Sequence, residues 1–288
     1  MPTTILVTGP TGTIGSQVVS QLAANKGVVV RAGVRDPKKA EGLRRENVEV
    51  VALDYDQPDT LAAACKGADK VFLLTPFAPN QVESGLRLLE AAKAAEVKHI
   101  VKLSAMGADQ EPGIQLGRWH REVEKAIEAS GVAWTFIRPN NFYENLVNYY
   151  GPDKEGAIYL PFGQGAVSFV DGRDVAACVV AALTGSGHEG KAYEVTGPEA
   201  LTMTQMAEIL SQATGRTIRY VDVPEEAAKK AMLDMGLPGW MVDAMMELHA
   251  IDKAGYAAAV TTSVKDVTGN PARSFRDFAR DHAAKWMA

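Results

Sequence analysis

Cysteine is nearly absent from this sequence, since only Cys65 and Cys178 occur in 288 residues. Two cysteines cannot build the disulfide framework of a small secreted domain, and their number fits a reducing compartment. No run of lysine or arginine offsets the formal net charge of -5, which argues against a surface for nucleic-acid backbones. No apolar stretch has the length of a membrane span, and the first residues lack the basic segment of a secretory signal. These absences predict a cytoplasmic protein that binds neither nucleic acid nor membrane.

Several catalytic and metal-binding patterns are also missing. The five histidines show no His-Glu-x-x-His spacing and no ligand cluster surrounds the cysteines, so no metal site is predicted. There is no Gly-x-Ser-x-Gly elbow of a serine hydrolase. The glycine-rich segment near the N-terminus lacks the Lys-Ser/Thr ending of a nucleoside triphosphatase.

Short apolar runs alternate with segments of helical period through the first half of the chain. The runs are rich in β-branched residues, as strands buried on both faces of a parallel sheet are. They are Ile5–Val7, Val28–Val30, Val48–Leu53, Val71–Leu74, Ile100–Leu103 and Trp134–Ile137. Between them, apolar residues such as Ile14, Val18 and Leu22 recur at helical spacing. The alternation predicts an α/β fold with a Rossmann-type doubly wound parallel sheet.

The rhythm changes after Asn140, where Asn, Tyr, Gly and Pro replace the long periodic segments. We expect helices over Asp174–Leu183, over 201–213 with Thr202 as N-cap, and over Met232–Leu248 with an interruption near Gly236–Gly239, and strands at Tyr193–Val195 and Ile218–Val223. No linker separates the two halves. The prediction is a sheet domain of residues 1–150, to which 171–198 return, and a smaller interwoven lobe of 151–170 and 199–288.

The strongest local signal is the glycine loop that follows the first predicted strand and opens a helix. Its residues are Gly9, Pro10, Thr11, Gly12, Thr13, Ile14 and Gly15. Small residues let backbone amides approach a pyrophosphate, and the helix N-terminus adds donors and a favourable dipole. A tight turn without a ligand is the alternative, but the position between strand and helix favours a dinucleotide.

Arg35 follows the second predicted strand, about 20 residues after Gly15. An acidic residue there binds the ribose 2′-hydroxyl of NAD, whereas an arginine suits the 2′-phosphate of NADP. We therefore expect NADPH as the cofactor, with Lys39 as a helper. The alternative is that the neighbouring Asp36 is a ribose ligand.

Together these residues resemble the short-chain dehydrogenase/reductase superfamily, and more narrowly its atypical NmrA-like branch. Besides the glycine loop and Val34–Pro37, the match includes Ser104, Ser130-Gly131, Thr135–Asn140, Phe169–Asp171, Asp174–Ala176, Thr196–Pro198 and Thr268–Pro271. The resemblance covers nearly the whole chain. That branch holds bacterial NADPH-dependent quinone reductases, reductases of triphenylmethane and azo dyes, and non-catalytic NADP sensors.

The Tyr-x-x-x-Lys pair that is usual in the superfamily is missing. In the matching segment, Leu116 falls at the tyrosine position and His120 at the lysine position. The loss argues against carbonyl–alcohol dehydrogenase and sugar-epimerase chemistry, which needs an acid–base group against an alkoxide-like centre. Hydride addition to a quinone, a cationic dye or another conjugated acceptor gives a delocalised product, for which positioning alone can be enough.

The candidate site residues are each weighed against a structural role. His120 is a candidate ribose ligand or proton relay, or a packed histidine. Ser104 could bond cofactor or substrate, or cap its strand; Tyr143 could donate to a substrate oxygen or form an aromatic wall. Other cofactor contacts are expected from Asp54, which could instead cap the next segment, and from Thr75, Pro76 and Asn140. Substrate contacts are expected from side chains that could equally be core: Phe77, Met106, Trp119, Phe142, Tyr143, Tyr149, Trp240 and Met245.

The predicted function is an NADPH-dependent reductase that transfers hydride to a quinone or another conjugated, aromatic acceptor. Its first domain would bind NADP and its smaller lobe a small aromatic or quinone-like substrate; the number of subunits is left open. The alternative is a non-catalytic NADP-binding redox sensor of the NmrA type. If positioning suffices, His120→Ala affects cofactor placement rather than an acid step. Otherwise His120 or Tyr143 is the proton donor.

Overall fold

Parallel strands dominate the first half of the chain in the computed structural model, which describes residues 2–287. Contacts divide the chain into two units. The first runs to Arg138 and includes Val175–Glu194, and the second comprises Pro139–Asp174 and continues from Val195. The predicted division placed the first boundary later, at residue 150, because nothing in the local sequence marks a break within a strand.

A seven-stranded sheet forms the centre of the first unit, in the order β3-β2-β1-β4-β5-β6-β9. Its strands are β1 (Thr3–Thr8), β2 (Val28–Val34), β3 (Val48–Ala52), β4 (Lys70–Leu73), β5 (His99–Leu103), β6 (Ala133–Pro139) and β9 (Lys191–Val195). The adjoining pairs from β3 to β6 are all parallel. Each of the six apolar runs in the first half therefore forms a strand, and the predicted doubly wound sheet is confirmed.

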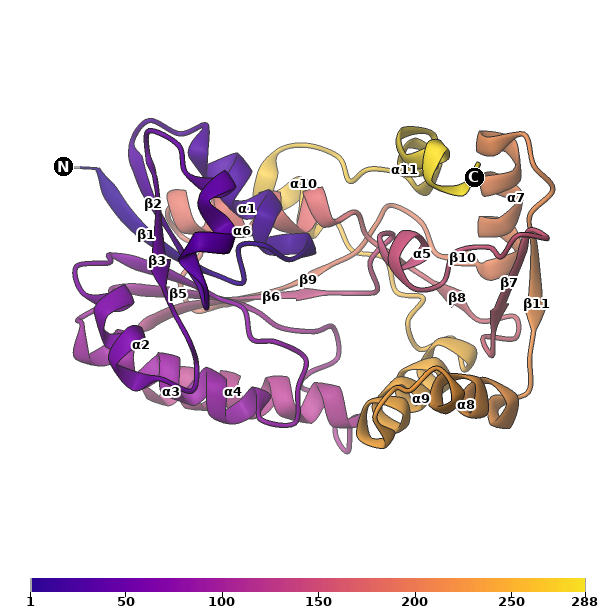
Figure 1. Ribbon diagram of the computed structural model, residues 1–288, viewed down its shortest axis with the longest axis horizontal. Helices are drawn as coiled ribbons and strands as arrows, with labels where there is room; N and C mark the ends of the chain where they lie inside the picture. The colour runs from indigo at the N-terminus through magenta and orange to yellow at the C-terminus, as the bar shows by residue number, and fades with distance from the viewer. Residues whose placement is uncertain (1, 288) are drawn as a thin grey trace. The chain divides into compact units, whose positions relative to one another are not determined.

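Helices cover both faces of this sheet (Figure 1). On one face lie α1 (Thr13–Ala23) and α6 (Gly172–Thr184), and on the other α2 (Pro58–Cys65), α3 (Gln81–Ala94) and α4 (Gln115–Ala129). A 3₁₀ helix, η1 (Pro37–Leu43), follows β2. The inner faces of α2 to α4 bury Leu61, Leu88 and Ile127 against the strands. Each such side chain contributes about 1.5–3 kcal/mol when it leaves water, which fixes the helices on the sheet.

The strand order reverses between β1 and β4. From β1 the chain proceeds outward to β2 and β3, and it then returns to place β4 on the other side of β1. In open α/β sheets, ligands bind at such a reversal, beyond the carboxyl ends of the strands. The glycine loop leaves β1 at this edge, so the topology places the strongest sequence motif where a ligand is expected.

The second unit contains two small sheets and most of the C-terminal helices. β7 (Ala157–Leu160) pairs in parallel with β11 (Arg219–Asp222), and β8 (Ala166–Val167) pairs antiparallel with β10 (Leu201–Thr202). The helices are α5 (Asn145–Asn148), α7 (Met203–Thr214), α8 (Glu225–Asp234), α9 (Gly239–Lys253), α10 (Ser263–Thr268), α11 (Phe275–His282) and the 3₁₀ helix η2 (Ala283–Trp286). The break predicted near Gly236–Gly239 separates α8 from α9. Thr202 caps α7 in a reciprocal pair with Gln205, as predicted.

Candidate active site

Three glycines shape the loop after β1, and two of them, Gly9 and Gly15, are required for steric reasons. Gly9 adopts a left-handed conformation with φ of 61°, and a Cβ there would lie 2.8 Å from Cδ2 of Leu74. A Cβ on Gly15 would collide with the carbonyl oxygen of Gly9. Gly12, by contrast, is exposed, and a Cβ there would meet nothing closer than 3.6 Å. The inner side of the loop is therefore closely packed, and its outer side carries no side chain at Gly12. This suits the close approach of a phosphate to the backbone.

The first turn of α1 is open to a ligand. Gly12 is its N-cap and supplies no side-chain oxygen, and the first turn carries no acidic residue. The first amides of a helix have no partner within the helix and attract anions. Thr11 and Thr13 are exposed beside them, whereas the side chain of Ile14 is buried, so Ile14 can offer only its backbone. The geometry fits the pyrophosphate of a dinucleotide.

Arg35 and Asp36 differ in what already occupies their side chains. Asp36 caps η1, because its carboxylate accepts a hydrogen bond from the backbone amide of Lys38 at 3.1 Å. It also lies 3.8 Å from the ammonium of Lys39. The Arg35 guanidinium is exposed and makes no hydrogen bond or ion pair with any residue in the range 2–287. An incoming phosphate would thus meet an uncommitted guanidinium at Arg35, which favours Arg35 over Asp36.

The other predicted strand-end residues line the loops beside β1. The carboxylate of Asp54 accepts from the backbone amide of Asp56 and the side-chain amide of Gln57, so it holds the turn before α2 and caps no amide of the helix. Thr75 and Pro76 follow Leu74, whose backbone is held by the Thr8 hydroxyl. Thr75 is half-buried and Pro76 is exposed at the switch point.

His120 meets a buried lysine that the sequence analysis missed. Nζ of Lys102, at the end of β5, lies 2.9 Å from Nδ1 of His120 on α4. Nε2 of the same imidazole lies 3.4 Å from the side-chain amide of Gln81, at the start of α3. His120 is half-buried, whereas Lys102 is only 1% exposed. Lys102 of the neighbouring strand β5 therefore contacts the histidine that falls at the lysine position of the superfamily.

Burial changes the proton affinity of both partners. Loss of solvent lowers the pKa of Lys102 to about 7, and the charge of Arg138 lowers it further while that of Glu124 opposes the shift. Burial also lowers the pKa of His120 well below its usual range, and the neighbouring Lys102 charge adds to the effect. His120 is thus neutral at neutral pH, and Lys102 is the member of the pair that changes charge there.

The Ser104 hydroxyl is engaged in a buried ion network. It donates to Glu124 Oε1 at 2.6 Å, and Arg138 binds the same carboxylate through two hydrogen bonds of 3.0 and 2.7 Å. Arg121 adds a further contact at 3.0 Å. Burial would raise the pKa of Glu124, but the hydrogen bonds from Arg138 and Ser104 outweigh it and hold the pKa below its usual value. With its one proton committed, Ser104 can still accept from a ligand but not donate.

Among the predicted substrate contacts, the structure brings Phe77 and Trp119 together. Their ring centroids lie 6.3 Å apart with planes inclined at 54°, and both rings are half-buried. Trp119 precedes His120 on α4, and Phe77 follows Pro76 at the end of β4. Met106 is half-buried in the loop after β5. This pair provides apolar aromatic surface of the kind that a conjugated substrate requires.

The remaining predicted residues belong to the second unit. Tyr143 is 1% exposed and packs against Phe275 and Phe278 at centroid distances of 5.1 and 5.3 Å. This burial favours a packing role for Tyr143 over that of a proton donor. The Asn140 amide nitrogen donates to Ser168 Oγ and to the Ala257 carbonyl oxygen, so it braces this loop. Phe142, Trp240 and Met245 are half-buried there, and Tyr149 is exposed.

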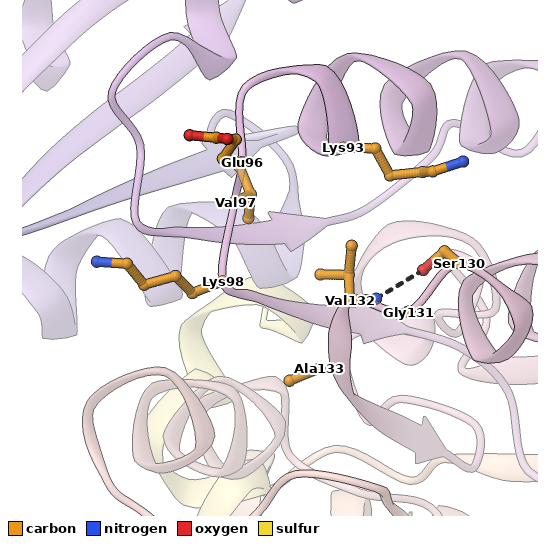
Figure 2. A pocket seen from close by; sticks show the side chains of 8 residues that line it. All are labelled: Lys93, Glu96, Val97, Lys98, Ser130, Gly131, Val132 and Ala133. Atoms are coloured by element: carbon orange, nitrogen blue, oxygen red, sulfur yellow. Dashed lines mark hydrogen bonds between the residues drawn. The ribbon is translucent and has the colours of Figure 1, made fainter.

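An open hollow of the first unit lies at the opposite edge of the sheet. Figure 2 shows its lining side chains, which come from the end of α3, the start of β5, the end of α4 and the start of β6: Lys93, Glu96, Val97, Lys98, Ser130, Gly131, Val132 and Ala133. Its two lysines already pair with Glu90 and Asp69. Because ligands of open α/β sheets bind at the carboxyl ends of strands, this hollow is not the candidate site.

No three His, Cys, Asp or Glu side chains within residues 2–287 gather in a way that could hold a metal ion. None of the helices in that range is long and apolar enough to cross a membrane.

Comparison with known proteins agrees with the fold and the loop. Residues 1–267 match the NmrA-like family. The chain is 47% identical over 285 residues to an NAD(P)H azoreductase of Xenophilus azovorans, and the match covers 99% of both chains. Among solved structures, it resembles the Escherichia coli NADPH-dependent quinone oxidoreductase QOR2 complexed with NADPH, with a TM-score of 0.86, 27% identity and coverage of 96% and 99% of the two chains. The Citrobacter sp. triphenylmethane reductase complexed with NADP(H) gives a TM-score of 0.86, 28% identity and coverage of 97% and 99%.

An α/β sheet with an open glycine loop at its switch point defines a dinucleotide-binding protein. The chain belongs to the NmrA-like family, as its sequence motifs predicted.

Proposed function

We propose that this protein is an NADPH-dependent reductase that transfers hydride to an azo, quinone or cationic-dye acceptor. The observation that carries the proposal is the 47% identity, along 99% of both chains, to an NAD(P)H azoreductase. The likeness to quinone and triphenylmethane reductases supports the same class of acceptor. These acceptors share a conjugated system with an electron-poor atom that takes up a hydride.

The first unit supplies the groups that would hold the cofactor. The backbone amides of the first turn of α1 would receive the pyrophosphate, and Arg35 the 2′-phosphate. When bound, NADPH supplies the hydride. Phe77 and Trp119 would hold the acceptor ring, and His120 follows Trp119 in α4. These residues orient the reactants and exclude water, which is the main requirement of hydride transfer to a conjugated acceptor.

The absence of a phenol at position 116 fits this class of reaction. Leu116 is half-buried on α4 at the position where the superfamily has its tyrosine, so no proton donor of that kind is present there. A carbonyl reduced to an alcohol would need such a donor, whereas a quinone or a cationic dye needs less help. We also place the protein in the cytoplasm, where both buried thiols, Cys65 and Cys178, would stay reduced.

The test follows the loss of NADPH absorbance with a panel of quinones, azo dyes and triphenylmethane dyes. We expect oxidation of NADPH with at least one acceptor of the panel, and slower oxidation at the same concentration of NADH. Arg35→Ala serves as the matched control, because it should slow the NADPH reaction while leaving the NADH reaction nearly unchanged. Tight NADPH binding without turnover of any acceptor would refute the reductase and favour the NADP sensor.

A further inference from the structure

The buried lysine behind His120 needs a reason, because a strand buried on both faces seldom contains one. Lys102 lies in the run Ile100–Leu103. Its register partners are Leu73 in β4 and Phe136 in β6. Its side chain is 1% exposed, and it makes no salt bridge in the described range. A buried ammonium without a paired carboxylate destabilises the fold. Lys102 is therefore buried despite the free-energy cost of removing an ammonium from water, and its contacts indicate what role it plays.

The polar contacts of Lys102 connect its buried amine to the imidazole of His120. Nζ donates to the backbone oxygen of Leu103 at 3.1 Å, and its other contact is Nδ1 of His120 at 2.9 Å. The imidazole continues the chain of contacts, since its Nε2 meets the Gln81 amide at 3.4 Å. Lys102 is buried, while His120 is half-buried on α4. The buried amine of Lys102 is thus connected by a hydrogen bond to the partly exposed imidazole of His120.

Two protonation states satisfy the same set of contacts. When Lys102 is an ammonium it donates to Nδ1, so the imidazole carries its proton on Nε2. When Lys102 is a neutral amine its lone pair accepts from Nδ1–H, and Nε2 becomes an acceptor. The Gln81 side chain can present its oxygen to the first state and its nitrogen to the second, because an amide can turn over. The site therefore holds two tautomers of His120 with the same atoms in place.

We infer that Lys102 and His120 form a proton relay, in which His120 donates to the reduced acceptor and Lys102, as a positioning residue, restores the imidazole. This inference rests on the reductase function proposed above. His120 gives the proton on Nε2 to a quinone or azo acceptor that has become an anion by gaining the hydride, and Nδ1 takes a proton from Lys102 Nζ. The relay resets when Nε2 takes a proton from water and Nδ1 returns its own to Lys102. The net change is one proton moved from water to product, with no change in electron count on the protein.

The charges around Lys102 set the pH at which the relay is loaded. Helix α4 contributes the carboxylate of Glu124, which favours the ammonium, and β6 contributes Arg138, which opposes it. Helix α3 contributes the neutral amide of Gln81, and β4 the neutral Leu73. Burial dominates these charges and brings the pKa of Lys102 to about 7. The relay is thus loaded below this pH and empty above it.

The first test uses the protein without cofactor or acceptor and follows the ring nitrogens of His120 by ¹⁵N NMR across a pH titration. We expect one inflection near pH 7, at which the proton moves from Nε2 to Nδ1 without formation of an imidazolium. Lys102→Met should abolish the inflection and leave one tautomer at every pH. Lys70→Met is the matched control, because Lys70 is a half-buried strand lysine at the start of β4, and it should leave the inflection unchanged. An inflection that persists in Lys102→Met would overturn the relay.

The second test measures kcat against pH with saturating NADPH and a quinone. Wild-type kcat should fall above pH 7, and Lys102→Met should show a flat profile with a loss on the order of 100-fold at pH 6. Lys102→Gln provides a second variant with a polar side chain in case the methionine disturbs packing. Parallel pH profiles in wild type and variants would refute the relay. Failure of the wild type to reduce any acceptor would instead refute the proposed function, while the NMR titration would still decide whether the pair exists.

Discussion

Removal of the Arg35 guanidinium should convert a protein that prefers NADPH into one that hardly distinguishes the two cofactors. Arg35 is exposed and makes no hydrogen bond or ion pair with another residue in the described range, so Arg35→Ala removes little except the group offered to a 2′-phosphate. Hydrogen bonds to charged groups contribute about 1.5–3 kcal/mol each. One such interaction therefore corresponds to an increase of about 10-fold to 150-fold in the Kd of NADPH. The Kd of NADH should change by less than about 2.5-fold, within the ~0.5 kcal/mol that surface substitutions usually produce.

Calorimetric titration with each cofactor, at one fixed ionic strength, measures this difference directly, since salt screens an exposed charge. Lys39→Ala is the matched control, because Lys39 is an exposed cation on the same segment that already lies near Asp36. It should weaken NADPH by much less than Arg35→Ala does. Equal losses of NADPH and NADH in Arg35→Ala would refute the reasoning and assign the ribose to Asp36.

Three further predictions concern the loop and the buried charges. Gly15→Ala should abolish the binding of both cofactors in the same titration, because its Cβ would collide with the Gly9 carbonyl, and a loss confined to NADPH would contradict this. Arg138→Met should lower the free energy of unfolding in urea by about 3–5 kcal/mol, because it strips two hydrogen bonds from the buried Glu124 carboxylate; a loss below about 1 kcal/mol would show that the pair is dispensable. Burial lowers the pKa of Lys102 from its ordinary 10.5 to about 7 in the fold, so the unfolded chain holds one more proton between these values. Wild-type stability should therefore rise with pH across that window by about 1.4 kcal/mol per pH unit relative to Lys102→Met, and equal slopes would refute the assignment.

The sequence predicts the sheet well because its signals are local. Short β-branched runs are typical of the strands of a parallel sheet, and each of the six runs in the first half forms a strand, five of them inside the sheet and Val48–Leu53 at its edge. The glycine loop was found for the same reason, since the steric demands at Gly9 and Gly15 arise within the loop and the strand next to it. Thr202 was likewise recognised as a cap from its immediate neighbours.

The polar contacts of the site were not predictable in this way, because they join elements that are distant in sequence. Lys102 interrupts an apolar strand, and this interruption was the one available signal that it has a special role. Its partner His120 comes from the next helix, and no periodicity specifies which side chain of α4 faces the end of β5. Tyr143 illustrates the converse. It follows a strand end, where a ligand contact is plausible, yet the distant residues Phe275 and Phe278 enclose it.

The way the chain passes between the two units has a consequence for its synthesis. It crosses after Arg138, returns after Asp174 and crosses again after Glu194, so each unit is assembled from separated stretches. Strand β9, which completes the sheet beside β6, leaves the ribosome only after Pro139–Asp174 has been made. During synthesis the edge of β6 is therefore unpaired until β9 has been made. The first part of the other unit also cannot complete its hydrophobic core until the C-terminal residues, including Phe275 and Phe278, have been made. Exposed strand edges pair readily with other chains. A ribosome that stalls before β9 would release an aggregation-prone fragment, and neither unit can be expressed by cutting the gene at a single point.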